Sequence, residues 1–201
     1  MSEVAAVILA GGRGERLGGA NKATIEIGGL RLIDRVRTAL AGCEPILIAA
    51  GRTPLALEGV RAVPDLDSDY AGPLAGVAAA VDALRDTEAQ WLLSVAVDTP
   101  FFPPDFIDRA NQVRGEVDVV VGCYGAQDYP TNALWRLTAI RTLPDDIHNG
   151  TAPHSLKRQI AALRSARLDY SPLAPEDPFA NVNTAEDLMN LRSRESSMTR
   201  G

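Results

Sequence analysis

Short apolar runs alternate with longer segments of mixed polarity along the first part of the chain. The runs that predict strands are residues 4–9, 45–50, 60–64, 91–97 and 117–124. The segments between them that predict helices are residues 32–40, 74–84 and 103–113. Strands that are apolar along their whole length are buried on both faces, and the helices that separate them provide the cover. The pattern therefore predicts an α/β fold with a mostly parallel central sheet and helices on both faces.

One domain is expected to account for nearly the whole chain. A length of 201 residues suits a single domain of ordinary size. No repeat, low-complexity tract or linker interrupts the alternation of strands and helices. The last segment, SRESSMTRG, is polar. We expect a domain of residues 1–192 and a flexible C-terminal tail of residues 193–201.

Composition and charge narrow the class of protein. Hydrophobic residues make up 46% of the chain and charged residues 23%, which is typical of a soluble globular protein. The formal net charge is -6 and no long basic run occurs, which argues against a nucleic-acid partner. The first apolar run is too short for a signal peptide or a membrane-spanning helix. The cysteines, Cys43 and Cys123, are expected to be reduced and buried, and the protein to be cytoplasmic without a membrane partner.

Glycines, cations and acids follow the predicted strands. LAGGRGERLGGANK, residues 9–22, begins at the end of the first strand and contains five glycines, two arginines and a lysine. DLDSDYAGPLAG, residues 65–76, follows the third strand, and DTP, residues 98–100, follows the fourth. Ligands of open α/β sheets bind beyond the carboxyl ends of the strands. A basic, glycine-rich loop with acids on neighbouring strands indicates a site for a nucleoside triphosphate and a divalent metal.

Two familiar phosphate loops do not fit this segment. The dinucleotide-binding motif requires a third glycine at position 17, which is Leu17. The Walker loop requires Ser or Thr after its lysine, whereas Lys22 precedes Ala23. The loop must therefore belong to another class of phosphate site.

The loop and four later motifs resemble one family of nucleotidyltransferases. These enzymes couple a nucleoside triphosphate to an acceptor phosphate, and the closest likeness is to the molybdenum cofactor guanylyltransferases. The motifs are LAGGRGERLGGANK (9–22), DLDSDYAGPLAG (65–76), VDTPFFPPD (97–105), DYPTNALW (128–135) and NVNTAEDL (181–188). The resemblance implies a single Rossmann-like domain of the nucleotide-diphospho-sugar transferase type. It also implies transfer of GMP from GTP to the terminal phosphate of molybdopterin, with or without bound molybdenum, and release of pyrophosphate.

The resemblance assigns a role to each motif. The residues it implies for catalysis are Arg16, Lys22 and Asp98, of which Asp98 would bind Mg²⁺ as the metal ligand. Those implied for GTP binding are Leu9, Ala10, Gly11, Gly12, Gly14, Lys22, Asp65, Gly72, Gly76 and Asp98. Those implied for the acceptor are Tyr129, Thr131, Asn181 and Asn183. Other proteins of molybdenum cofactor biosynthesis and molybdoenzyme chaperones are the implied protein partners.

Several alternatives stay open at the level of the sequence. Asp98 can instead cap the turn that follows its strand, and Asn183 or Thr184 can cap a helix with Glu186 or Asp187. The acceptor or base can differ, as in a molybdopterin cytidylyltransferase or a sugar-phosphate nucleotidyltransferase. A protein of another class, one that binds the nucleotide or cofactor without catalysis, is the third alternative. Loss of Lys22, Asp65 or Asp98 would have favoured it, but all three are present.

Overall fold

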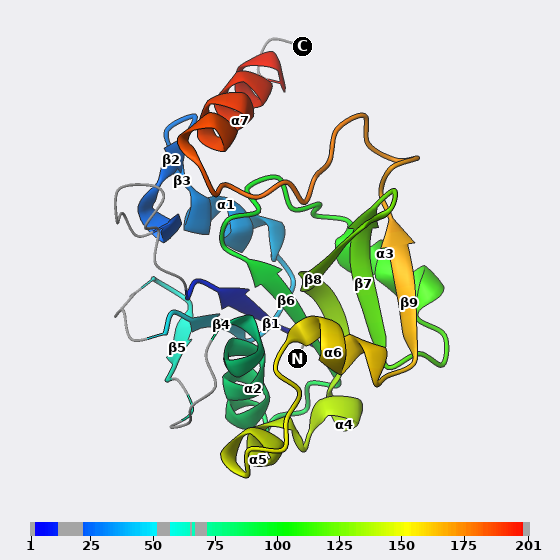
Figure 1. The fold of residues 1–201 in the computed structure, drawn as a ribbon. Helices are drawn as coiled ribbons and strands as arrows, with labels where there is room; N and C mark the ends of the chain where they lie inside the picture. Colours follow the sequence, from blue (N-terminus) through cyan, green and yellow to red (C-terminus); the bar gives the residue numbers. More distant parts are fainter. Residues whose placement is uncertain (1–2, 12–21, 52–56, 65, 67–71, 199–201) are drawn as a thin grey trace.

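The fold is built on one seven-stranded sheet, shown in a computed structural model that describes residues 3–11, 22–51, 57–64, 66 and 72–198 (Figure 1). The strand order is β5-β4-β1-β6-β8-β7-β9. The strands are β1 (Val4–Leu9), β4 (Ile46–Ala49), β5 (Arg61–Val63), β6 (Trp91–Ala96), β7 (Val119–Tyr124), β8 (Gln127–Arg136) and β9 (Ser165–Asp169). Only β8 runs antiparallel to its neighbours within this sheet, so the predicted mostly parallel sheet is confirmed.

Helices cover both faces of the sheet, as predicted. They are α1 (Leu32–Ala39), α2 (Pro73–Ala83), α3 (Phe106–Val113), α4 (Leu137–Ile140), α5 (Leu143–His148), α6 (Leu156–Ala161) and α7 (Ala185–Met198). A short 3-10 turn, η2 (Lys22–Thr24), precedes a small hairpin of β2 (Glu26–Ile27) and β3 (Leu30–Arg31). Helix α2 lies on one face with α4, α5 and α6 nearby, whereas α1 and α3 cover the other (Figure 1).

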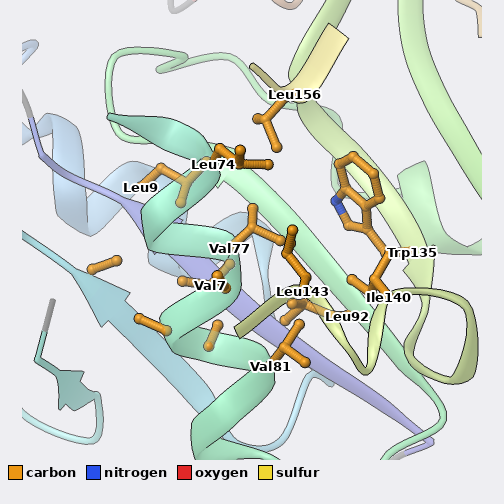
Figure 2. Close-up of a cluster of buried hydrophobic side chains, with 14 of the residues drawn as sticks. Val7, Leu9, Leu74, Val77, Val81, Leu92, Trp135, Ile140, Leu143 and Leu156 are labelled. Atoms are coloured by element: carbon orange, nitrogen blue, oxygen red, sulfur yellow. The ribbon is translucent and has the colours of Figure 1, made fainter. Parts of the chain in front are cut away.

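Alternation along β1 divides its side chains between two cores. Ala5, Val7 and Leu9 belong to the core beneath α2, and the residues between them belong to the core beneath α1 and α3. Figure 2 shows Val77 of α2 turned toward Val7 of the sheet. Because successive side chains of a strand point to opposite faces, an entirely apolar strand requires cover on both.

The main differences from the predictions concern α3, β8, β9 and α7. Helix α3 begins at Phe106 rather than at residue 103, because the two prolines form a turn before it. The predicted strands do not include β8, which contains Pro130 and returns from β7 as a hairpin, or β9, which pairs with β7 in parallel. Helix α7 continues to Met198, past the predicted domain boundary at residue 192. Arg194 of this helix forms an ion pair with Glu176 at 2.8 Å, so contacts to the domain extend beyond that boundary.

Both cysteines are free and buried, as predicted. Burial raises the pKa of the Cys43 thiol to about 12, so this thiol stays protonated at neutral pH. The protein therefore keeps Cys43 as an apolar packing residue.

Within the described part of the chain, no helix is both long enough and apolar enough to cross a membrane.

Candidate functional site

The carboxyl ends of three parallel strands are aligned at one edge of the sheet. Leu9, the last residue of β1, is in register with Ala49 of β4 and with Ala96 of β6. The alignment continues past the strands, since the Ala10 N–H donates to the Ala49 carbonyl at 2.9 Å and the Val97 N–H donates to the Leu9 carbonyl at 3.1 Å. The segments that follow β1, β4 and β6 therefore leave the sheet side by side, as expected for a ligand site in such a fold.

A lysine, an aspartate and an asparagine meet at this edge. The Lys22 ammonium donates to Oδ2 of Asp98 at 2.6 Å and to Oδ1 of Asn183 at 2.7 Å. Asp98 and Asn183 lie 76 and 161 positions from Lys22 in the sequence. The side chains of Lys22 and Asp98 are 17% and 14% exposed, so the pair is largely, but not completely, shielded from water. The fold thus joins three of the predicted site residues in one cluster.

The backbone holds Asp98 at the point where β6 ends. The Thr99 N–H donates to the Ala96 carbonyl at 3.1 Å, which closes a tight turn around Asp98. The Val182 N–H donates to the carbonyl of Asp98 at 3.0 Å. This contact binds the segment before α7 to the end of β6, and it places Asn183 beside Asp98.

The start of α7 is capped, as one of the sequence alternatives predicted. The Asp187 N–H donates to Oγ1 of Thr184 at 3.1 Å, and the Thr184 N–H donates to Oδ2 of Asp187 at 2.8 Å. The same carboxylate accepts from the Asn183 N–H, and this bond is the main reason that the pKa of Asp187 is lowered. The backbone of Asn183 therefore stabilises the helix, while its side-chain oxygen faces Lys22.

Part of the backbone of the first loop is hydrogen-bonded to the sheet. The Ala10 N–H is bonded to Ala49, whereas Gly11 is exposed beyond the strand. A Cβ atom at Gly11 would lie 3.7 Å from the nearest atom, the Gly51 nitrogen, so packing does not require a glycine there. Gly11 is therefore the described residue of this loop at which a ligand has the clearest approach to the backbone.

The two glycines predicted from the third motif differ in their surroundings. Gly72 is exposed, has a φ of 83°, and directly precedes Pro73, the first residue of α2. Gly76 is buried in α2, where a Cβ atom would lie 2.8 Å from Cδ2 of Leu9 and 3.1 Å from Cβ of Ala49. The missing side chain at Gly76 lets α2 approach β1 and β4 closely, and its contact with a nucleotide stays a prediction.

Tyr129 and Thr131 lie on β8. The Tyr129 hydroxyl donates to the Asp177 carboxylate, and its ring packs against Phe179 with the ring centroids 5.3 Å apart. Burial and then Asp177 raise the pKa of the tyrosine, so its hydroxyl stays protonated. Thr131 is half-buried two residues farther along the strand. These contacts connect β8 to the segment before α7, and the acceptor role of both residues stays a prediction.

Four of the predicted residues, Gly12, Gly14, Arg16 and Asp65, lie outside the described residues. Asn181 is placed close to the cluster, since the Thr99 hydroxyl donates to its Oδ1 at 3.2 Å. Thr99 and Asn132 are not among the residues predicted from the sequence. Asn132 donates to the Thr99 hydroxyl from a fully buried position. The available signal was a polar residue in an otherwise apolar stretch, NALW, of the fourth motif.

The oxygen atoms of the cluster are suitable ligands for a hard divalent cation. Asp98 and Asn183 direct one carboxylate oxygen and one amide oxygen to the same ammonium group. Magnesium binds through one or two carboxylates and completes its shell with water and phosphate oxygens. The described residues contain no group of three or more acids, histidines and cysteines that could hold a metal without such help. The donor set thus fits a metal that arrives with a triphosphate.

Comparison with known proteins gives a consistent family. A family model described as "MobA-like NTP transferase domain" matches residues 6–171. A molybdenum cofactor guanylyltransferase of Nitrobacter hamburgensis is 36% identical over 90% of this chain and 90% of its own. Another, from a Bradyrhizobium species, is 35% identical over 92% and 90%. The crystal structure of molybdopterin-guanine dinucleotide biosynthesis protein A from Archaeoglobus fulgidus superposes with a TM-score of 0.69 at 22% identity, covering 96% of this chain and 99% of that one.

Proposed function

The chain belongs to the MobA-like NTP transferase family, and from this premise we propose that it transfers GMP from GTP to the terminal phosphate of molybdopterin. The observation that carries the proposal is the contact of Lys22 with Asp98 and Asn183 at the carboxyl edge of the sheet. Relatives named molybdenum cofactor guanylyltransferase, which match this chain over most of its length, support the choice of substrates.

The proposed reaction is an in-line displacement at the α-phosphorus of GTP. An oxygen of the molybdopterin phosphate forms the new P–O bond, and the bond to the β-phosphate oxygen breaks as pyrophosphate leaves with the electron pair. A phosphate monoester has its second pKa near 6, so it is largely ionised at neutral pH and needs no strong general base. Catalysis therefore depends on alignment and on stabilisation of charge.

Lys22 supplies positive charge next to the proposed triphosphate site. Its ammonium group is now held by oxygens of Asp98 and Asn183 and is not fully buried, so it can turn to a phosphate oxygen when these two oxygens bind the metal. Negative charge moves toward the pyrophosphate during the reaction, and a fixed cation there is worth more in the transition state than in the ground state. We propose the same role for Arg16, which precedes Lys22 in the same loop.

Asp98 and Asn183 are the residues that would hold Mg²⁺. When bound, the metal ion neutralises charge on the triphosphate and helps to orient it. Asp98 would contribute a carboxylate oxygen from a fixed turn, and Asn183 would contribute a neutral amide oxygen from the segment before the capped helix. Because the protein would supply only these two oxygens, the metal ion would keep coordination positions for phosphate oxygens.

Guanine selectivity is proposed to come from the backbone. Guanine presents N–H donors at N1 and N2 beside an O6 acceptor, a pattern that cytosine and adenine lack. The segments of residues 9–11 and 72–76 can offer carbonyl and N–H groups to this edge, and both Gly11 and Gly72 are exposed. An unmatched buried polar group costs about 1–3 kcal/mol, so two mismatches suffice for a preference of at least about tenfold.

The test of the function is pyrophosphate release from GTP, CTP and ATP, measured with and without molybdopterin. We expect release to require molybdopterin and kcat/KM to be highest for GTP. A preference for CTP would replace guanylyl transfer with cytidylyl transfer, and release with a sugar phosphate alone would identify another acceptor. Binding of GTP without any product would indicate the non-catalytic alternative. Three further points stay predictions. They are whether the acceptor already carries molybdenum, which proteins are partners, and that the protein is cytoplasmic.

A further inference from the structure

Three polar side chains of the described residues, Ser94, Thr99 and Asn132, are fully buried. They form two separate hydrogen-bonded groups between β6 and β8. In the first, Trp135 Nε1 donates to the Ser94 hydroxyl at 2.9 Å, and that hydroxyl donates to the Ala133 carbonyl at 3.3 Å. The second contains Thr99 and Asn132 and lies next to Asp98. The two groups have similar burial, but only the second touches the turn that carries the proposed metal ligand.

Asn132 lies where β6 and β8 stop pairing through their backbones. The paired residues run from Trp91 and Arg136 to Ser94 and Ala133. Beyond that point, Oδ1 of Asn132 accepts the N–H of Ala96 at 3.1 Å. The side chain thus takes the place of a backbone acceptor for the last residue of β6. An apolar side chain at position 132 would leave a buried donor without that partner.

The direction of each hydrogen bond in this group is determined by its first member. Ala96 offers an N–H, so the oxygen of the Asn132 amide must face it, and the Asn132 nitrogen then donates to Thr99 Oγ1 at 3.4 Å. The Thr99 hydroxyl is left with its proton free to donate, and it donates to Oδ1 of Asn181 at 3.2 Å. Ala96 and Thr99 are the first and last residues of the turn that contains Asp98, so Asn132 is hydrogen-bonded to both ends of this turn.

The same group reaches the second oxygen ligand of the cluster. Asn181 is followed by Val182, whose N–H donates to the Asp98 carbonyl, and then by Asn183, whose oxygen faces Lys22. A shift of Asn132 would therefore move the turn of Asp98 and the segment of Asn183 together. Hydrogen bonds in a buried, low-dielectric environment hold their geometry strongly when every member is satisfied.

We propose that Asn132 is a positioning residue for nucleotidyl transfer: through Thr99 and Asn181 it sets the relative placement of the Asp98 and Asn183 oxygens that bind the metal. This inference rests on the proposed function of Asp98. Asn132 itself touches neither the nucleotide nor the metal in this account. Its substitution should therefore lower kcat more than it raises KM for GTP, because the base and the triphosphate keep their other contacts.

The experiment compares variants of the second group with a matched variant of the first. Asn132→Leu removes both hydrogen bonds at similar volume, Thr99→Val removes the hydroxyl, and Thr99→Ser retains it. We expect Asn132→Leu and Thr99→Val to lower kcat about 10- to 100-fold, since a misplacement near 1 Å can cost about 100-fold. Thr99→Ser should retain most of the activity. Ser94→Ala is the control, because it disturbs an equally buried bond between the same strands away from Asp98.

Measurements of kcat, KM for GTP and the free energy of unfolding separate the outcomes. A normal kcat in Asn132→Leu and Thr99→Val, with Asp98→Ala inactive, would overturn the positioning role and leave the proposed function intact. Normal activity in Asp98→Ala would exclude Asp98 as the metal ligand, and it would overturn this inference as well. An equal loss of kcat in Ser94→Ala would also overturn the inference, because lost stability alone would then explain the effect. If Asn132→Leu fails to fold, the comparison of Thr99→Val with Thr99→Ser decides.

Discussion

The carboxyl edge of the sheet and the apolar layer beneath α2 differ in the kind of residue they contain and in exposure to solvent. At the edge, Lys22, Asp98 and Asn183 come from distant parts of the sequence and keep contact with solvent. In the layer, Val7 and Val77 are fully buried and belong to the same apolar cluster (Figure 2). The edge thus contributes polar groups in defined positions, whereas the layer contributes buried apolar side chains, which stabilise the fold. Substitutions at the edge should cost activity, and substitutions in the layer should cost stability.

The largest expected effect is the loss of activity in Asp98→Ala. Without its carboxylate the site loses the charged ligand of the metal, and removal of one such electrostatic group lowers kcat by about 100- to 1,000-fold or more. The free energy of unfolding should change by less than about 1 kcal/mol, because the released Lys22 ammonium can turn toward water. Asp98→Asn, which keeps the size of the side chain, should be similarly inactive. Turnover close to that of the parent in Mg²⁺ would exclude Asp98 as the metal ligand.

Lys22→Met should have the next largest effect. The same charge serves GTP binding and the transition state, so we expect a higher KM and a lower kcat, with kcat/KM reduced about 100-fold. Arg85→Met is the matched control, since Arg85 forms an ion pair with Asp145 at 2.7 Å beyond the other end of α2. Calorimetric titration with GTP and steady-state kinetics measure the two effects. Unchanged affinity together with unchanged turnover would remove Lys22 from the site.

Two glycines allow a direct test of the difference between the regions, because Gly11 lies at the carboxyl edge and Gly76 lies in the apolar layer. Gly76→Ala places a methyl group 2.8 Å from Leu9 Cδ2, and overpacking of this kind costs about 1–3 kcal/mol, partly offset by the better helix propensity of alanine. We expect a net loss of about 1 kcal/mol in the free energy of unfolding. Gly11→Ala has room for its methyl group and should leave stability unchanged while raising KM for GTP.

Denaturant unfolding and kinetics on the same two variants provide the measurement. If Gly11→Ala destabilises the protein and Gly76→Ala does not, the assignment of the two glycines to site and layer is reversed.

The difference between the two regions also explains what could be predicted from the sequence. The parallel strands are recognisable because burial on both faces leaves continuous apolar runs, as in residues 4–9. Of the hairpin formed by β7 and β8, only β7 is predicted from the sequence. β8 has no continuous apolar run, because it begins with exposed polar residues and contains Pro130. Lys22, Asp98 and Asn183 were proposed from separate motifs, but their common hydrogen bonds depend on strand order, which the sequence does not show. The role of Thr99 and Asn132 depends on where two strands separate, and this point has no local signature.

The smallest expected effect is a pH-dependent loss of stability in Asp187→Asn. The folded-state pKa of Asp187 is lowered, mainly by the Asn183 N–H, so the carboxylate stabilises the fold above its unfolded-state pKa of about 4 and loses this effect as pH falls through the folded-state value. Loss of a helix cap costs about 1 kcal/mol, and we expect that loss near pH 7. Denaturant unfolding from pH 7 to about pH 3 should show the difference between variant and parent shrinking toward acid. A difference that is constant over this range would contradict the assignment.

The position of the bound metal ion is the most direct test of the proposed site. Crystals of the protein with Mn²⁺ and a non-hydrolysable GTP analogue can locate the ion by its anomalous scattering. We expect one ion within about 2.5 Å of a carboxylate oxygen of Asp98, with the triphosphate on the same side and the Lys22 ammonium in contact with phosphate oxygens. An ion and a triphosphate bound elsewhere, with the contact between Lys22 and Asp98 unchanged, would contradict it.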